Sequence, residues 1–251
     1  MITYEYPLNE RVRTLLRLED LFDRVGFYSA RVEATDHQSA LMAIFEIIEV
    51  ASRGDLKSDL LQELDRQRLF LEALRGNPAI SEEKLATVIT EIETAFHDLI
   101  GLSGKTGQHL RENEWLMTIK QRASIPGGIC EFDLPSYFHW LNRDETVRRA
   151  DLSTWSAPLM PVAAGLRIVL RVLRESGKSS ARVAYGGIYQ ETPMERAAQM
   201  LRLTVDRALL CVPEISANKY ALNIRFILPG SVQRTKLYEH DVDFQLTYCN
   251  L

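Results

Sequence analysis

Arginines recur at helical spacing near the N-terminus of the sequence. Arg13, Arg17 and Arg24 fall within about 40° of one another when each helical residue turns the chain by about 100°. Such a stripe, on the face away from most neighbouring leucines, can bind carboxylates, because the planar guanidinium group donates two parallel hydrogen bonds to one carboxylate. Since like charges repel, the stripe favours an anionic partner.

A second basic face is expected near the C-terminus. Lys219, Asn223 and Arg225 share one face of a strand by its period of two. A simpler explanation holds for any one arginine, because exposed charges are the norm on protein surfaces. Glu10 and Asp20 lie close to the arginine stripe and could pair with its members.

Catalytic, nucleotide and metal motifs are weak in this chain. Gly104-Lys105-Thr106 resembles the end of a phosphate-binding loop, but Leu99 stands where that motif requires glycine, so a turn between helices is favoured. No two histidines are spaced i, i+4, and the three cysteines lie far apart. We therefore expect no disulfide framework, no metal site and no cofactor.

The segment 121–141 is the most unusual in the chain. Its Pro-Gly-Gly sequence forces a turn. Either it is a connector whose aromatic side chains fill a core, or it is a rigid loop that positions Arg122 and His139 for binding. Cys130 and His139 could serve as nucleophile and base, but a small buried thiol is the favoured interpretation of Cys130. No enzymatic activity is predicted.

Helical periodicity fills the first two thirds of the sequence, and the period then changes to two. Helices are predicted from caps at Asn9, Asp36, Asp55 and Ser81, over about 107–121, and after Ser156 to Gly177. Strands are predicted at 182–190, 201–205, 220–228 and 242–248, with a short one through Cys130, Phe132 and Leu134 before a helix that begins at Pro135.

Helices followed by strands indicate the α+β class, with an N-terminal all-α domain and an antiparallel β domain. The predicted division places residues 1–177 in a mainly helical domain and residues 178–251 in a β domain. Residues 122–135 form a turn and short strand that could pack on the β domain. The chain of 251 residues is long enough for one large or two small domains.

Composition excludes several classes of protein. With 46% apolar and 25% charged residues and a net charge of −4, the chain is globular and not a polycation bound to nucleic acid. A nucleic-acid-binding module that uses the basic faces is retained as the alternative function. No signal peptide and no uninterrupted apolar run long enough to span a membrane is present, so a cytoplasmic protein without a membrane partner is expected.

Several segments in register resemble the ZapD family, the Z-ring-associated proteins D of bacterial cell division. The match covers nearly the full length, and Ser-Ile-Pro-Gly-Gly followed by Phe-Asp-Leu-Pro is its most specific part. The other segments are Tyr6-Pro7-Leu8-Asn9-Glu10 with Arg13 and Arg17, Arg53-Gly54 before residues 60–67, Gly187-Ile188-Tyr189-Gln190 and Ile224-Arg225-Phe226.

The resemblance implies a binding protein without catalytic activity. Members of this family are homodimers that bind the C-terminal tail of FtsZ, the tubulin-like GTPase of the division ring. They cross-link FtsZ protofilaments into bundles and so support Z-ring assembly and septum formation. Such a protein acts in the cytoplasm and is recruited to the division site at mid-cell.

The resemblance also implies a basic pocket for the FtsZ tail. Carried over by position, the candidate residues are Arg17, Arg53, Arg122, Lys219 and Arg225, with Arg13 and His139 as further candidates. His139 is the less secure match, because the family's histidine can stand at a neighbouring position. Ala221 stands where a relative can carry a basic residue, so this pocket could be less charged.

Overall fold

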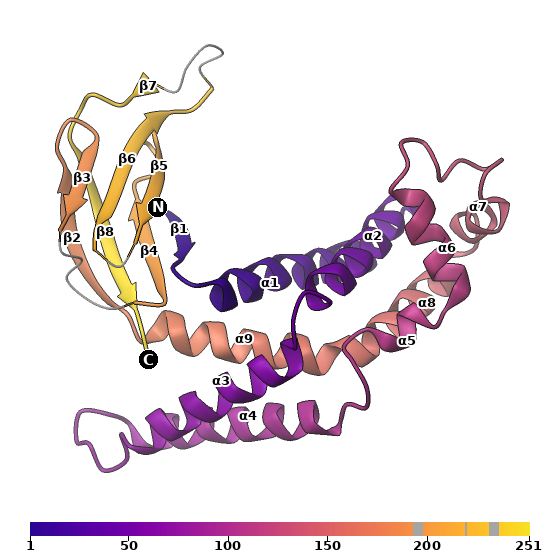
Figure 1. Ribbon diagram of the computed structural model, residues 1–251, viewed down its shortest axis with the longest axis horizontal. Coiled ribbons are helices and arrows are strands. Elements are labelled where there is room, and N and C mark those ends of the chain that lie inside the picture. Colours follow the sequence, from indigo (N-terminus) through magenta and orange to yellow (C-terminus); the bar gives the residue numbers. More distant parts are fainter. Residues whose placement is uncertain (193–197, 219, 231–235) are drawn as a thin grey trace. The chain divides into compact units, whose positions relative to one another are not determined.

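The computed structural model of the protein describes residues 1–192, 198–218, 220–230 and 236–251 (Figure 1). Its helices are α1 (Glu10–Ser29), α2 (Ala34–Ala51), α3 (Leu56–Glu72), α4 (Glu82–Gly101), α5 (Gln108–Arg111), α6 (Glu114–Ala123), α7 (Pro135–Leu141), α8 (Glu145–Ser156), the 3-10 helix η1 (Ala157–Leu159) and α9 (Met160–Glu175). Its strands are β1 (Ile2–Pro7), β2 (Lys178–Ala184), β3 (Ile188–Glu191), β4 (Met200–Val205), β5 (Val212–Ala217), β6 (Leu222–Leu228), β7 (Lys236–Leu237) and β8 (Val242–Cys249).

The chain divides into two compact units. We call Thr14–Val169 the helical unit, and Met1–Arg13 together with Leu170–Leu251 the β unit. The predicted α+β class is confirmed, with helices in the N-terminal part and antiparallel strands in the C-terminal part.

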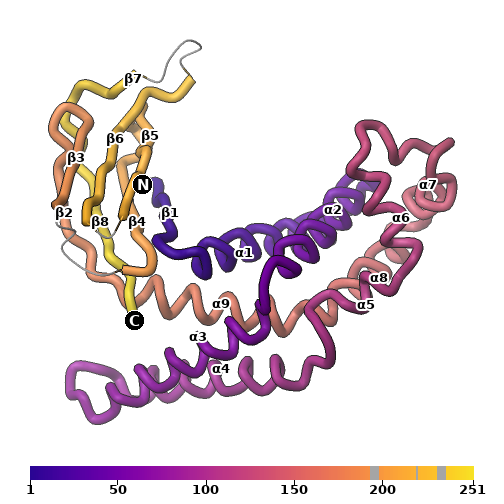
Figure 2. Tube along the Cα trace, in the orientation of Figure 1, coloured from indigo at the N-terminus to yellow at the C-terminus, as the bar shows by residue number. Residues whose placement is uncertain are grey.

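The β unit contains two antiparallel sheets that share one core (Figure 2). One sheet has the strand order β1-β4-β8-β2, and the other has β3-β6-β5 with β7 paired to β6. Alternate residues of β4, β6 and β8 are buried, as their period of two predicts. The rings of Phe226 and Phe244, one from each sheet, lie 5.5 Å apart, so the two sheets pack face to face.

The N-terminal strand β1 was not predicted. It pairs antiparallel with β4, and Tyr4 lies opposite Leu203. Tyr4 and Tyr6 pack against the core of the β unit, while Glu5 between them points to the other face. The alternation is present in the sequence, but its partner strand lies almost 200 residues further along the chain.

The helical unit is built from amphipathic helices that bury aliphatic side chains. In α2 the apolar face includes Leu41, Ile44 and Ile48, each at most 2% exposed. The helices α3 and α4 form a hairpin in which they pack along their lengths (Figure 1). Helix α9 approaches this hairpin closely, because a Cβ atom at Gly165 would lie 3.0 Å from Leu99 Cδ1.

A buried arginine joins three segments of the helical unit. Arg148 of α8 donates from Nε to His37 Nδ1 at 2.8 Å and from Nη2 to the Val32 carbonyl at 2.8 Å. Its Nη1 donates to the carbonyls of Leu141 and Arg143. Because His37 Nδ1 accepts a hydrogen bond, its ring is neutral, and Nε2–H donates to the Arg31 carbonyl at 2.8 Å.

Three of the four predicted helix caps are correct. The caps at Asn9, Asp55 and Ser81 are confirmed, because each side chain accepts a hydrogen bond from the first turn of its helix. The cap at Asp36 is wrong, since α2 begins at Ala34 and Asp36 pairs with Arg31 instead.

The region after α4 also differs from the prediction. The pattern at 107–121 forms two helices, α5 and α6, because Asn113 caps the second. The short strand through Cys130, Phe132 and Leu134 is wrong: residues 124–133 form turns. Helix α7 begins at Pro135 as predicted.

The helical stretch Glu145–Glu175 is long and apolar enough, by length and composition, to cross a membrane. Charged residues interrupt it, so it is not a continuous apolar run of that length. Half of its most apolar window is buried inside the protein. That burial is typical of a core helix, which passes the same test of length and composition.

Candidate functional site

The arginine stripe on α1 is partly satisfied by acids of the same helix. Arg13 Nε lies 3.3 Å from Glu10 Oε2. Arg24 Nη2 lies 2.9 Å from Asp20 Oδ2, and both side chains are more than half exposed. Arg17 is also exposed. The acids expected near the stripe therefore do pair with two of its members.

Arg53 lies in the turn between α2 and α3. The turn is fixed by Asp55, whose carboxylate caps α3 by accepting from Ser58 N at 3.2 Å and from Ser58 Oγ at 2.7 Å. Arg53 is exposed. The pKa of the nearby Glu49 is lowered, mainly by the hydrogen bond and the charge of Lys120. The charge of Arg111 and then that of Arg53 lower it further.

Arg122 lies in the last turn of α6 and supports the Pro-Gly-Gly turn through its backbone. Its carbonyl accepts a hydrogen bond from Ile125 N at 3.0 Å. A Cβ atom at Gly128 would lie 2.5 Å from that same carbonyl oxygen, so only glycine fits there. The guanidinium group lies 3.8 Å from Asp133 and is about half exposed. The loop therefore holds Arg122 at the surface beside an acid of the same chain.

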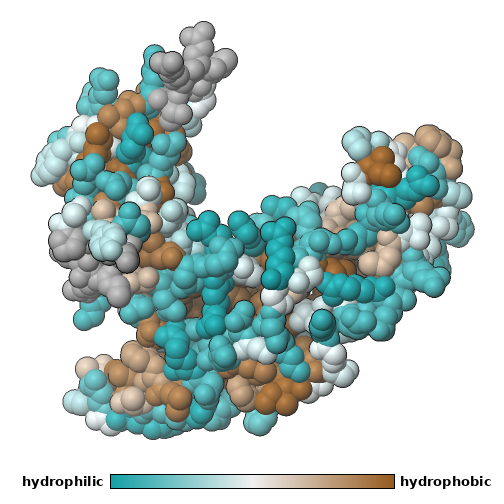
Figure 3. Space-filling model, in the orientation of Figure 1, coloured by the Kyte–Doolittle hydropathy of each residue, from teal (hydrophilic) through white to brown (hydrophobic). Residues whose placement is uncertain are grey.

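Apolar side chains gather at the surface of this loop. Ile125 is 48% exposed and Phe132 is 81% exposed. In the space-filling view, hydrophobic residues are visible at the end of the helical unit where α6 connects to α7 (Figure 3). Cys130 is exposed, so its prediction as a buried thiol is wrong. The turns of 124–133 keep its side chain out of the core.

His139 lies on the exposed face of α7. The opposite face buries Tyr137 and Trp140, which stack with their ring centroids 5.9 Å apart. Burial raises the pKa of Tyr137. The neighbouring residue Phe138 is also exposed. Tyr137 and Trp140 thus fill a core beneath α7, while His139 remains accessible to a partner.

Arg225 projects from the outer face of the β3-β6-β5 sheet. It lies opposite Ile188 of β3 and Glu214 of β5. Asn223 lies two residues away on the same face, as the strand period predicts. Lys219, expected to share this face, lies outside the described residues.

The candidate residues stand on different elements of both units. Arg13 and Arg17 are one helical turn apart on α1, and Arg122 and His139 flank the α6–α7 connection. Arg53 and Arg225 lie on the α2–α3 turn and on β6. A single pocket that contains all of them stays a prediction.

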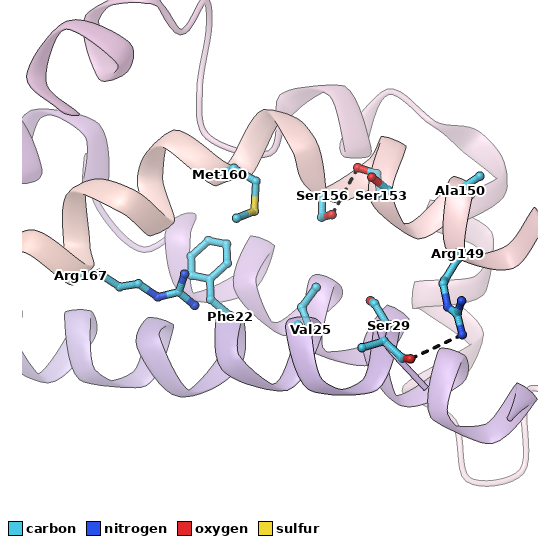
Figure 4. Close-up of a pocket in the computed structure, with 11 residues that line it drawn as sticks. Phe22, Val25, Ser29, Arg149, Ala150, Ser153, Ser156, Met160 and Arg167 are labelled. Atoms are coloured by element: carbon cyan, nitrogen blue, oxygen red, sulfur yellow. Dashed lines mark hydrogen bonds between the residues drawn. The ribbon is translucent and has the colours of Figure 1, made fainter. Parts of the chain in front are cut away.

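A groove of about 560 Å³ lies between α1 and the α8–η1–α9 stretch (Figure 4). Phe22 of α1 and Met160 of α9 point toward one another at its centre. At one end, Ser29 Oγ and Arg149 Nε are buried without a hydrogen-bond partner among the described residues. The groove is therefore apolar at its centre and offers polar groups at one end.

Sequence reasoning missed a cavity lined by Lys57, Lys105 and Arg111. Lys57 lies in the first turn of α3, Lys105 in the α4–α5 connection and Arg111 at the end of α5, so no single helical or strand period brings them together. Within the described ranges, no group of three or more His, Cys, Asp or Glu side chains could hold a metal ion.

The chain is similar to known cell division proteins over most of its length. The sequence pattern of the ZapD family, described as a cell division protein, matches residues 16–225. The chain is 57% identical over 251 residues to the Cell division protein ZapD of Azoarcus sp. (strain BH72), covering 100% of both chains.

Two further relatives bear the same name. In Nitrosomonas europaea the identity is 53% over all of this chain and 96% of the relative. In Chromobacterium violaceum it is 52% over 99% of each. These names describe a role in cell division and no catalytic activity. The chain belongs to the ZapD family of cell division proteins.

Proposed function

We propose that this protein binds the C-terminal tail of FtsZ and, as a homodimer, cross-links FtsZ protofilaments during Z-ring assembly and septum formation. It acts in the cytoplasm at the division site, by binding alone, without a cofactor or a metal. Its membership of a cell division family and the basic side chains at its surface support this proposal.

One observation carries the proposal. The side chains of Arg53, His139 and Arg225 are exposed, and none of these side chains forms a hydrogen bond or an ion pair with another described residue. Arginine is well suited to a carboxylate-bearing peptide, because its fork can bind both carboxylate oxygens. The exposed Phe132 and Ile125 add apolar surface for the peptide's other side chains.

A dimer makes weak contacts effective. Two-fold symmetry provides two identical sites, and a filament presents many tails. Linked binding events of this kind raise apparent affinity by roughly 10²–10⁴ without new contacts. Cross-linking therefore needs no tight single site.

The test is co-sedimentation of the protein with polymerising FtsZ, in full-length and tail-truncated forms. Full-length FtsZ should bundle and truncated FtsZ should not. The charge reversals Arg17→Glu and Arg225→Glu should abolish bundling while the far-UV circular dichroism and the dimer mass stay unchanged.

Two matched variants control for general electrostatics. Lys84→Glu reverses an exposed charge in the helical unit, to which Arg17 also belongs, and Arg207→Glu reverses an exposed charge in the β unit. Both should bundle as the unmodified protein does. Equal bundling of truncated FtsZ would refute tail recognition, and retention of DNA or RNA in a filter assay would favour the nucleic-acid alternative.

A further inference from the structure

Two cavities surround the loop between α4 and α5. The larger, of about 840 Å³, lies between the α2–α3 turn and this loop and is lined by Lys57, Lys105 and Arg111 together with Asp55. The second, of about 510 Å³, shares Lys57 and Lys105 with it. Lys105 belongs to Gly104-Lys105-Thr106, the sequence that resembles the end of a phosphate-binding loop.

Two of the three cations hold the loop in place. Lys57 Nζ donates to the carbonyls of Leu102 at 2.6 Å and Ile100 at 3.3 Å, at the C-terminal end of α4. Arg111 donates to the Thr106 carbonyl at 2.9 Å and, at the end of α2, to the Ile48 carbonyl at 2.9 Å. Cations favour these positions, because helix C-termini carry partial negative charge.

Glycines fix the path of the loop between these two anchors. Gly104 and Gly107 have φ of 72° and 75°, the left-handed region that favours glycine. A Cβ atom at Gly107 would also lie 3.3 Å from Ile48 Cγ1. Lys105 O accepts from Gln108 N at 3.0 Å and closes the turn. The loop therefore presents Lys105 from a defined backbone.

Positive charge exceeds negative charge along the wall of the larger cavity. Its lining contains three cations and one carboxylate, an excess of two positive charges. The carboxylate of Asp55 is already bound as the cap of α3. The charges of Lys57 and Lys105 both act on it, after the larger effect of the Ser58 hydrogen bonds, and lower its pKa.

Hydrogen bonds to backbone carbonyls account for the positions of Lys57 and Arg111, but Lys105 has no such role. The Lys105 ammonium forms no hydrogen bond and no ion pair with any residue of the described chain. A nucleotide is not favoured as its ligand, because the helix α4, and not a strand with a glycine-rich loop, leads into the turn.

We infer that this cavity binds a carboxylate of the acidic partner peptide and that Lys105 makes the contact. The inference rests on the proposed function and names one part of its site. Ser52 and Gly54 line the cavity on either side of Arg53 in the chain, which connects the cavity to a residue already expected to bind the tail. The residues that line the cavity come from the helical unit alone.

The size of the space favours a peptide over a small inorganic ion. Cavities of about 300–1,000 Å³ accommodate ligands with many atoms. A phosphate ion would contact Lys105 but leave most of the 840 Å³ unfilled. A peptide can place an acidic side chain beside Lys105 and extend along the α2–α3 turn.

The experiment measures the affinity of a labelled FtsZ tail peptide for the full-length protein by fluorescence anisotropy. Lys105→Gln should weaken binding by about threefold to tenfold, and Lys105→Glu should weaken it further, because it replaces an attraction by a repulsion. Lys84→Gln and Lys84→Glu are the matched controls, since Lys84 is exposed on α4 and is not among the residues that line these cavities. Both controls should bind the peptide normally.

Amine acetylation with mass spectrometry gives a second measurement on the unmodified protein. Bound tail peptide should protect Lys105 from acetylation and leave Lys84 unprotected. Tight binding without protection, or Lys105 variants with unchanged affinity, would overturn the inference and leave the proposed function intact. If the unmodified protein binds no tail peptide, the proposed function fails and the inference fails with it. Displacement of the peptide by inorganic phosphate without protection of Lys105 would assign the effect to another anion site.

Discussion

At the scale of single residues, the chain separates its basic side chains into two kinds. Arg148 is 6% exposed and donates to one imidazole and several carbonyls, so it serves the fold. The side chains of Arg53 and Arg225 are exposed and form no such bonds within the described chain. The residue type is the same, and burial decides its role, because a buried charge must be satisfied by its own protein.

His37 couples this buried network to pH. Burial lowers the pKa of His37 from its ordinary value of 6.5, and the charges of Arg148 and Arg149 lower it further, against the Arg31 carbonyl and Asp36, which raise it. The unfolded chain therefore takes up the proton more readily than the folded protein. The free energy of unfolding should fall as the pH drops below about 6.5 toward the lower pKa of the folded state.

The comparison of His37→Gln with the unmodified protein tests this coupling. Urea unfolding at pH 7.5 and at pH 5.5 is followed by tryptophan emission, which reports the helical unit because Trp115, Trp140 and Trp155 pack together there. The variant should lose less stability between the two pH values. His97→Gln, at an exposed position of α4, should keep the full pH dependence. Equal pH dependence in all three proteins would contradict the coupling.

At the scale of the elements, Glu5 links β1 to its surroundings in the β unit. Arg174 donates from Nε and Nη2 to the two carboxylate oxygens of Glu5, both at 2.8 Å. Arg202 of β4, directly opposite Glu5, lies 3.1 Å away. The three side chains are partly buried, at 20–34% exposure, so this network is screened less than a surface ion pair.

Glu5→Ala should therefore destabilise the protein by about 1–3 kcal/mol, because two partly buried arginines lose their carboxylate. Urea unfolding followed by far-UV circular dichroism measures the change. Glu175→Ala removes an exposed carboxylate next to Arg174 in the chain and should have little effect. If both variants unfold at the same urea concentration, the network contributes nothing measurable.

Elements with local signals were predictable from the sequence, and elements held by distant partners were not. The caps at Asp55 and Ser81 and the alternation in β6 and β8 depend on neighbouring residues, and they were predicted correctly. The strand β1 was missed because its pairing is formed almost 200 residues away. The predicted strand near Cys130 failed because three alternating residues are too few to outweigh the Pro-Gly-Gly turn beside them.

In the candidate site too, residues with a local sequence signal were predictable and residues brought together by tertiary contacts were not. Period two placed Asn223 and Arg225 on one face, and the structure confirms it. Lys105 could be noticed only as a failed phosphate-binding motif, because the cavity that it lines is formed by two turns and by the hydrogen bonds of Lys57 and Arg111. Tertiary contacts of that kind leave no periodic pattern in a sequence.

At the scale of the whole molecule, charge is divided unevenly along the chain. Residues 1–177 carry 21 basic and 27 acidic side chains, and residues 178–251 carry 9 and 7. The net charge of −4 therefore describes neither part. What matters to an acidic peptide is the local field at a cavity or an exposed arginine, because at physiological salt a charge is screened beyond about 8–10 Å.

Salt should then affect bundling more steeply than binding of one tail. Below saturation, a bridge between two filaments requires both sites of a dimer to be occupied, so its population follows the product of two occupancies. If a rise in sodium chloride weakens tail binding by about threefold, bridging should fall by roughly ninefold. Anisotropy with a single tail peptide gives the first value, and light scattering of FtsZ filaments at the same protein concentrations gives the second. Equal losses in the two measurements would mean that one occupied site is enough for each cross-link, which would contradict a bivalent dimer.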